Sequence, residues 1–211
     1  KKGLTDKGRD VIQHMIDRGM MVDFAHMSSK TMENVYSILA PKKYPFYFSH
    51  GHFRDAMKDG LGRFEKSTSK QMLLKMKELG GVFGIRTITF GTHHVDKSIQ
   101  NNCDGSSLSV AHLLKWGNDL GINMAFGSDF NGFIPQTRPR FSKTDKDYCP
   151  GQKVKGLGTK YDFTGLGNVV QIPELLKDLK NLGTNTDSLE ESAEKFINVW
   201  ERSYAQRAND S

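Results

Sequence analysis

The sequence of 211 residues contains only two cysteines, Cys103 and Cys149, and their spacing is not that of a C-x-x-C pair. This argues against a zinc knuckle or a thioredoxin-type site, and it leaves open whether the two form a disulfide. No apolar run approaches the roughly 20 residues that a membrane-spanning helix requires. No signal peptide opens the chain. There is also no Gly-x-Gly-x-x-Gly loop after a first strand, which argues against a doubly wound nucleotide-binding domain.

The sequence has little excess charge of either sign in any one place. The net charge is +6, from 30 basic and 24 acidic residues that are interspersed along the chain. The densest basic stretch, residues 138–160, reads as a solvated loop, so a nucleic-acid partner is not expected. Apolar residues make up 36% of the chain, which suits one globular domain over residues 1–211 with a sizeable core.

Strand-like and helix-like patterns alternate through the first two thirds of the chain. Four short apolar runs read as strands, and each follows a stretch of helical periodicity that a serine or threonine precedes. This order predicts the α/β class with parallel strands. Long loops follow the strands and short loops precede them, as in (βα)-barrel enzymes. The predicted strands are residues 20–26, 44–50, 82–90 and 122–126.

The last third of the chain is less regular. Residues 133–167 are rich in Gly, Pro and Lys and have no clear period, and unpatterned loops of this length are often functional. Two helices are predicted after it. The first has Pro173 near its first turn, and the second carries Leu189, Phe196 and Trp200, which we expect to pack in the core.

Two of the predicted strands end in a histidine, His26 and His50. Parallel strands joined by a helix place their carboxyl ends on the same rim of the sheet, so the two imidazoles should stand side by side. Two histidines converging at a strand rim are typical of divalent metal sites in α/β barrels. The alternative for each histidine, taken alone, is an ordinary polar residue at the point where a strand meets a loop.

A carboxylate follows the fourth predicted strand at the same rim. Asp129 lies in Gly-Ser-Asp-Phe-Asn-Gly, where the glycines allow the backbone to turn sharply. A carboxylate beside a metal site can take a proton from water. The alternative is that Asp129 only stabilises the turn.

Four motifs together resemble those of a known family. These are Gly-Leu-Thr-Asp-x-Gly-Arg at residues 3–9, Val-Asp-Phe-Ala-His-Met-Ser at 22–28, Phe-Ser-His at 48–50 and Gly-Ser-Asp-Phe-Asn-Gly at 127–132. In this order they resemble the membrane (renal) dipeptidase family of the metal-dependent amidohydrolase superfamily. The resemblance implies that the chain is the C-terminal half of a (βα)₈ TIM-type barrel, a single catalytic-type domain that is incomplete.

The resemblance also implies a function. The members of this family hydrolyse dipeptides at a site of two Zn²⁺ ions that share a hydroxide. Carried over to this sequence, His26 and His50 are ligands of one zinc, and Asp129 transfers the proton and faces the substrate's amino group. Arg63, in Gly-Arg-Phe, resembles the arginine that holds the substrate's carboxylate, although the loop before it is slightly longer than usual.

Several family elements are absent from the sequence. The His-x-Asp motif of the first strand, the glutamate that bridges the metals and the oxyanion histidine would all precede residue 1, so we expect the natural protein to be longer. Two histidines are fewer than the three ligands of usual catalytic zinc sites, so a non-catalytic binding or scaffold domain is the alternative. An extracytoplasmic location, periplasmic or lipid-anchored, is favoured over the cytoplasm, and a homodimer is left open.

Overall fold

Four parallel strands form one sheet in the order β1-β2-β3-β4. The computed structural model describes residues 3–57, 65, 67–89, 101, 103–141, 149 and 153–208. The α/β class and the parallel direction predicted from the sequence are confirmed. The strands are β1 (Val22–Asp23), β2 (Phe46–Gly51), β3 (Phe83–Ile85) and β4 (Met124–Phe126).

Helices follow or precede each strand. The first four are α1 (Asp6–Asp17), α2 (Ser29–Leu39), α3 (Lys70–Glu78) and α4 (Ser107–Asp119), and α5 (Tyr161–Thr164), α6 (Ile172–Asn181), α7 (Asp187–Glu190) and α8 (Ser192–Tyr204) come after β4. Short 3₁₀ turns are η1 (Ala40–Lys42), η2 (Arg54–Ala56) and η3 (Val169–Gln171). None of the helices in the described residues is long and apolar enough to cross a membrane.

Side-chain caps set the starts of the first four helices. Thr5, Ser28, Ser69 and Ser106 each have extended backbone angles and accept a hydrogen bond from a backbone amide in the first turn. Such a bond satisfies one of the amides that a helix start leaves unpaired, so the hydroxyl residues determine where each helix begins.

The sheet is anchored by aromatic side chains that are almost completely buried. The rings of Phe24 and Phe46 stack with centroids 3.9 Å apart, and Phe48 lies against Phe83 at 5.2 Å. Phe53 extends this cluster to Trp116 of α4, at 4.9 Å. This packing holds β1, β2 and β3 in a fixed register, which positions the residues that follow them.

The strands are shorter than the sequence predicts. The stretch 20–26 contributes only Val22–Asp23, and 82–90 contributes Phe83–Ile85. His26 has a φ of 64°, in the left-handed region, so the chain turns before the histidine is reached. A strand-like apolar pattern reports burial, whereas pairing also requires a neighbour in register.

The last helices also differ from the prediction. The second predicted helix is divided into two at Glu191. This residue is the C-cap of α7 and also the N-cap of α8. Leu189 is buried as expected, but Phe196 and Trp200 are 41% and 49% exposed, so the prediction that they belong to the core is wrong for this structure. The ring of Phe196 packs edge-on against that of Tyr47, with centroids 5.5 Å apart.

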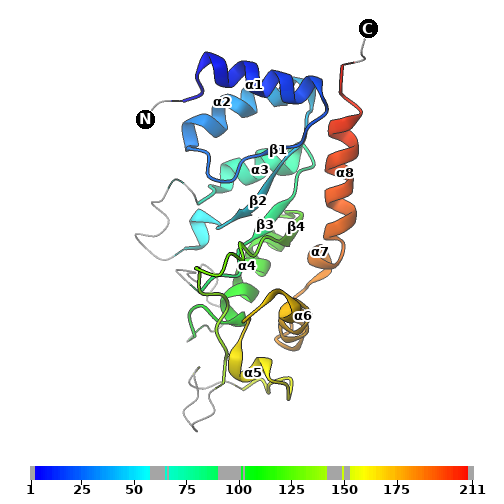
Figure 1. Ribbon diagram of the computed structural model, residues 1–211. Helices are drawn as coiled ribbons and strands as arrows, with labels where there is room; N and C mark the ends of the chain where they lie inside the picture. The colour runs from blue at the N-terminus through cyan, green and yellow to red at the C-terminus, as the bar shows by residue number, and fades with distance from the viewer. Residues whose placement is uncertain are drawn as a thin grey trace.

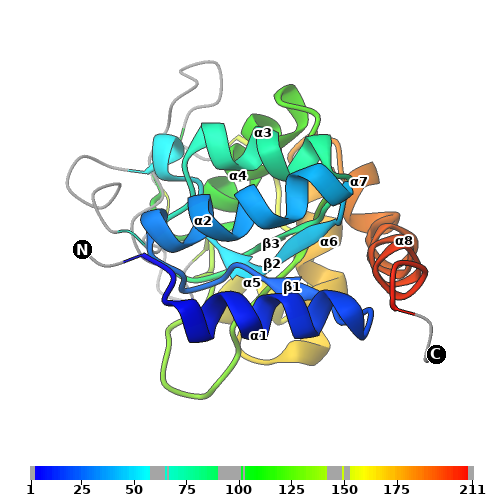
Figure 2. The same ribbon diagram turned by 90° about the horizontal axis from the view of Figure 1, so that it is seen from above.

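The arrangement of the elements is visible in two views. Helices α1 and α2 lie at the end of the molecule that contains the N-terminus, and α5 and α6 lie at the opposite end (Figure 1). Helix α8 lies beside the strands, away from α2 and α3 (Figure 2), and it contacts β4. The C-terminal segment therefore flanks the sheet.

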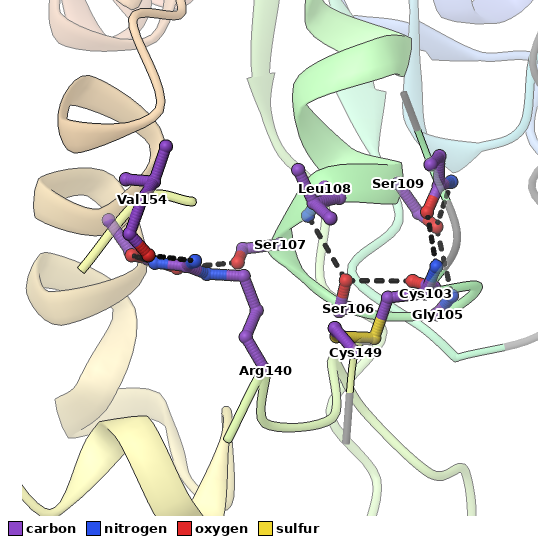
Figure 3. Close-up of a disulfide and its surroundings, with 11 residues drawn as sticks. Cys103, Gly105, Ser106, Ser107, Leu108, Ser109, Arg140, Cys149 and Val154 are labelled. Carbon is purple, nitrogen blue, oxygen red and sulfur yellow. Dashed lines mark hydrogen bonds and ion pairs between the residues drawn. A yellow bond between two sulfur atoms is a disulfide. The ribbon is translucent and has the colours of Figure 1, made fainter. Parts of the chain in front are cut away.

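A disulfide and a buried ion pair are two of the links that tie the irregular segment after β4 to the rest of the fold. Cys103 and Cys149 form a disulfide with their Cα atoms 4.9 Å apart (Figure 3), which answers the question that the sequence left open. Arg140 reaches from the same segment to Asp178 of α6, and both side chains are 2% exposed. These links pin the segment against α4 and α6.

Candidate metal and catalytic site

The two histidines meet at the rim of the sheet. The Nε2 atoms of His26 and His50 are 2.7 Å apart, although 24 positions separate the residues. Their rings are tilted by 59°, with centroids 4.7 Å apart. The parallel pairing of β1 and β2 produces this approach, as the strand–helix–strand pattern predicts. At this distance one Nε2 donates a hydrogen bond to the other, because two lone pairs would repel each other.

Asp23 fixes the turn that delivers His26. Its Oδ1 accepts hydrogen bonds from the backbone amide of Ala25, at 2.9 Å, and from that of Ser49, at 3.0 Å. One carboxylate oxygen therefore ties the end of β1 to the end of β2. The Oγ of Ser49 lies 3.0 Å from Nδ1 of His50. A partner on Nδ1 orients the ring and leaves Nε2 for a ligand.

Both His26 and Asp129 adopt the left-handed backbone conformation. Their φ angles are 64° and 53°, and Lys43 is the third non-glycine residue of this kind in the described residues. Side chains other than glycine enter this region at an energetic cost, and such residues cluster at functional sites. The conformation turns each side chain out of its strand direction at the rim.

Asp129 is held in place by the strand pairing before it and by Gln136 in the loop after it. The amide of Gly127 donates to the carbonyl of Ile85, at 2.9 Å, which continues the β3–β4 pairing into the motif. Gln136 then braces the turn: its Nε2 donates to the carbonyl of Ser128, at 3.1 Å, and its Oε1 accepts from Thr87, at 2.6 Å. The carboxylate is thus presented from a rigid loop.

A cation faces this carboxylate. Arg86 follows β3 directly, and its Nη2 forms an ion pair with Oδ2 of Asp129. The backbone amide of Arg86 donates to the carbonyl of Gly51, at 3.2 Å, so the residue lies between the ends of β2 and β4. Arg86 is therefore adjacent to both His50 and Asp129 in the sheet order.

The environment of His50 favours its neutral form. Partial burial lowers the pKa of His50 below its ordinary value of 6.5, and the charges of His26 and Arg86 act in the same direction. The charges of Asp129 and Asp23 oppose this shift without cancelling it. A neutral imidazole has a lone pair to offer to a metal ion.

The histidine pair fits a metal ion in geometry and chemistry, but the set is incomplete. Zinc bound to two imidazoles at the usual 2.0–2.1 Å in a tetrahedron would place their nitrogens about 3.3 Å apart. A small rotation of either ring from the present 2.7 Å reaches that value. In the described part of the chain, no group of three or more His, Cys, Asp or Glu side chains is arranged to hold a metal.

The sequence prediction identified three of these residues and missed others. His26, His50 and Asp129 lie on one rim, whereas the predicted Arg63 lies outside the described residues. Arg86 was missed. Its signal was a single charged residue within the apolar stretch 82–90.

The fold matches solved structures of dipeptidases. Over 97% of this chain and 50% of the other, it aligns with a dipeptidase AC, described as a metallopeptidase of family M19, with a TM-score of 0.66 at 19% identity. A metallopeptidase from Rhodobacter sphaeroides, bound to a phosphinate mimic of the dipeptide L-Ala-D-Ala, aligns with a TM-score of 0.65 at 19% identity, over 96% of this chain and 48% of that one. The match to about half of each longer chain confirms the prediction of a partial barrel.

Sequence comparison supports the same assignment. Dipeptidase tcpJ of Claviceps purpurea is 29% identical over 132 residues, which are 62% of this chain and 28% of that protein. The chain thus spans less than a third of the length of this relative. The family model described as membrane dipeptidase, peptidase family M19, matches residues 1–138, well over half of the chain. The chain therefore belongs to the membrane dipeptidase family.

Proposed function

We propose that the protein containing this chain is a zinc-dependent dipeptidase with two zinc ions, and that His26 and His50 bind one of them. The observation that carries the proposal is the 2.7 Å approach of their Nε2 atoms. Asp129 stands at the same rim, close enough for its charge to act on His50. Membership of a dipeptidase family supports a dipeptide as the substrate.

Each residue has a part in amide hydrolysis. Zinc, when bound, supplies a Lewis acid that activates water and polarises the substrate carbonyl. His26 and His50 present Nε2, and Ser49 orients the second ring through Nδ1. Asp129 accepts a proton and passes it to the leaving amine. The peptide C–N bond breaks, and water supplies the hydroxyl group to the acyl carbon and a proton to the amine. Arg63 is expected to bind the substrate's carboxylate.

Metal binding can be tested on the chain itself. Calorimetric titration with zinc alone should give binding that His26→Gln or His50→Gln weakens at least about tenfold. His14→Gln is the matched control, because His14 lies in the last turn of α1 and should leave affinity unchanged. Zinc affinity that is the same in all four proteins would refute the assignment of these ligands.

Activity must be tested in the protein at its native length. A panel of L,L- and L,D-dipeptides should be hydrolysed with zinc, not after chelation, and again after zinc is restored. Asp129→Asn should lower kcat about 100-fold or more while zinc affinity is retained. Full metal occupancy without hydrolysis of any dipeptide would refute the peptidase proposal.

A binding or scaffold role is the second candidate. It is favoured by one observation, that the described residues provide two histidines and no third ligand beside them. On this alternative, the protein of native length binds zinc no better than the His26→Gln variant and releases no amino acid from any dipeptide.

We also propose an extracytoplasmic location, because Cys103 and Cys149 are bonded and disulfides persist in oxidising compartments. Alkylation of the protein taken directly from its cells should leave both cysteines unlabelled until a reductant is added. Labelling without reductant would contradict this location.

A further inference from the structure

A cavity lies between helices, outside the rim that carries His26, His50 and Asp129. It has a volume of about 420 Å³ and is bounded by α4 and by the turn that follows α6. Helix α6 packs against α4 (Figure 1), so the turn after α6 is carried to the side of α4. None of the three rim residues lines the cavity. A volume of this size is typical of small-molecule sites, which span about 300–1,000 Å³.

One wall of the cavity is apolar and belongs mainly to a single face of α4. Leu108, Ala111 and Lys115 recur at helical spacing, and the side chains of the first two form the wall together with Leu182. Leu108 and Ala111 are 5% and 2% exposed. Leu108 and Leu182 also pack against the buried disulfide, so a covalent link lies behind this wall. The wall is therefore preformed and can bury an apolar group.

The opposite wall is the turn between α6 and α7. The amide of Thr184 donates to the carbonyl of Leu179, at 3.0 Å, which ends α6. Gly183 has a φ of 76°, and a Cβ atom there would meet nothing within 4 Å, so the turn leaves space beside it. Nδ2 of Asn118 donates to the carbonyl of Asn185, at 3.0 Å, and thereby fastens the turn to α4. The cavity therefore lies between two elements that are fastened to each other.

Two charges of opposite sign stand at the edge of the apolar wall. Nζ of Lys115 lies 2.8 Å from Oδ2 of Asp119, one helical turn further along α4. Their side chains are 34% and 60% exposed, and such pairs are held only weakly because water competes for both groups. Among the described residues that line the cavity, only these two are charged, so the lining as a whole is neutral. A ligand that matches it carries one anionic and one cationic group beside an apolar body.

We propose that this cavity binds a free α-amino acid with an apolar side chain. The carboxylate of the amino acid pairs with Lys115, and its ammonium group pairs with Asp119. Its side chain lies against Leu108, Ala111 and Leu182. The ligand then satisfies both charges of the ion pair, and the apolar wall is removed from water. This site does not depend on the proposed dipeptidase function, and it can be tested without zinc.

Four ligands separate the three contacts. L-Leucine has all three groups, L-leucinamide lacks the carboxylate, 4-methylpentanoate lacks the ammonium group and glycine lacks the side chain. Each is titrated calorimetrically into the full chain in the presence of EDTA, which removes any metal. Leucine should bind with a Kd below about 5 mM. Leucinamide and 4-methylpentanoate should bind at least about threefold more weakly, and glycine at least about tenfold more weakly.

Two variants assign the contacts to residues. Lys115→Gln should abolish the advantage of leucine over leucinamide, and Asp119→Asn should abolish its advantage over 4-methylpentanoate. The matched controls are Lys195→Gln and Glu191→Gln, which break an exposed i,i+4 pair on α8 and should leave all affinities unchanged. Partial unfolding of a variant lowers the fraction of binding-competent protein for every ligand equally, so it leaves the ratios between ligands unchanged.

Three results overturn the proposal. The first is a Kd for leucine above about 5 mM, and the second is an analogue that binds as tightly as leucine. The third is a Lys115→Gln or Asp119→Asn variant that keeps the wild-type preferences, because the amino acid then binds elsewhere on the chain. None of these measurements uses hydrolysis of a dipeptide, so this proposal and the proposed function fail independently.

Discussion

The buried ion pair between Arg140 and Asp178 gives the sharpest stability prediction. The carboxylate accepts from Nε of Arg140 at 3.0 Å, from its Nη2 at 2.5 Å, and from Oγ of Ser107 at 2.5 Å. Nη1 of Arg140 also donates to the carbonyl of Val154, at 3.2 Å (Figure 3). Counted over all atoms of the residue, Asp178 is 1% exposed and Arg140 is 3% exposed.

Replacing Asp178 with Asn keeps the shape and removes the charge. The guanidinium of Arg140 is then left in a buried site without its counter-ion, and breaking a buried pair in this way costs about 3–5 kcal/mol of unfolding free energy. Asp119→Asn is the matched control, because Asp119 pairs with Lys115 at an exposed i,i+4 position where such pairs contribute about 0.3–0.5 kcal/mol.

Chemical denaturation followed by circular dichroism measures both changes. A double variant, Arg140→Met with Asp178→Leu, separates the charge from the packing. Because it removes both ions, it should recover most of the stability that Asp178→Asn loses. The reasoning is refuted if Asp178→Asn costs no more than Asp119→Asn, or if the double variant is less stable than the single one.

Three further changes have calculable outcomes. Replacing Cys103 and Cys149 with alanine opens a loop of 46 residues and should lower the unfolding free energy by about 4 kcal/mol in denaturant titration, and a loss below 1 kcal/mol would contradict the entropic argument. In thermal denaturation, Lys43→Gly should raise the free energy of unfolding by about 1 kcal/mol, because Lys43 is exposed and its φ of 50° is less costly for glycine than for lysine. Lys42→Gly, in the adjacent 3₁₀ turn, is the control and should lower the free energy of unfolding. The pKa of His50 is lowered in the folded state, so the unfolded state binds more protons below pH 6.5. The free energy of unfolding of the metal-free chain, measured by denaturant titration, should therefore fall as the pH drops through that window. His50→Gln should make this fall less steep. The same dependence on pH in the variant and the wild type would contradict the prediction.

Local chemistry in the sequence was sufficient to predict much of the fold. Hydroxyl caps, apolar periodicity and the glycines between elements act over a few residues, so they can be read without knowing the tertiary structure. The alternation of strands and helices implied parallel pairing, and this in turn predicted that His26 and His50 would be adjacent. The same motifs indicated the family that the family model matches.

The tertiary structure decided which distant side chains meet. The pairing of Arg86 with Asp129, that of Arg140 with Asp178 and the disulfide depend on strand register and on the direction of each side chain after its strand ends. Backbone conformation is part of this, because the left-handed angles of His26 and Asp129 are maintained by surrounding contacts rather than by their own preferences. Local sequence therefore determined the elements and the candidate ligands, while long-range packing determined the charge that faces the predicted catalytic aspartate.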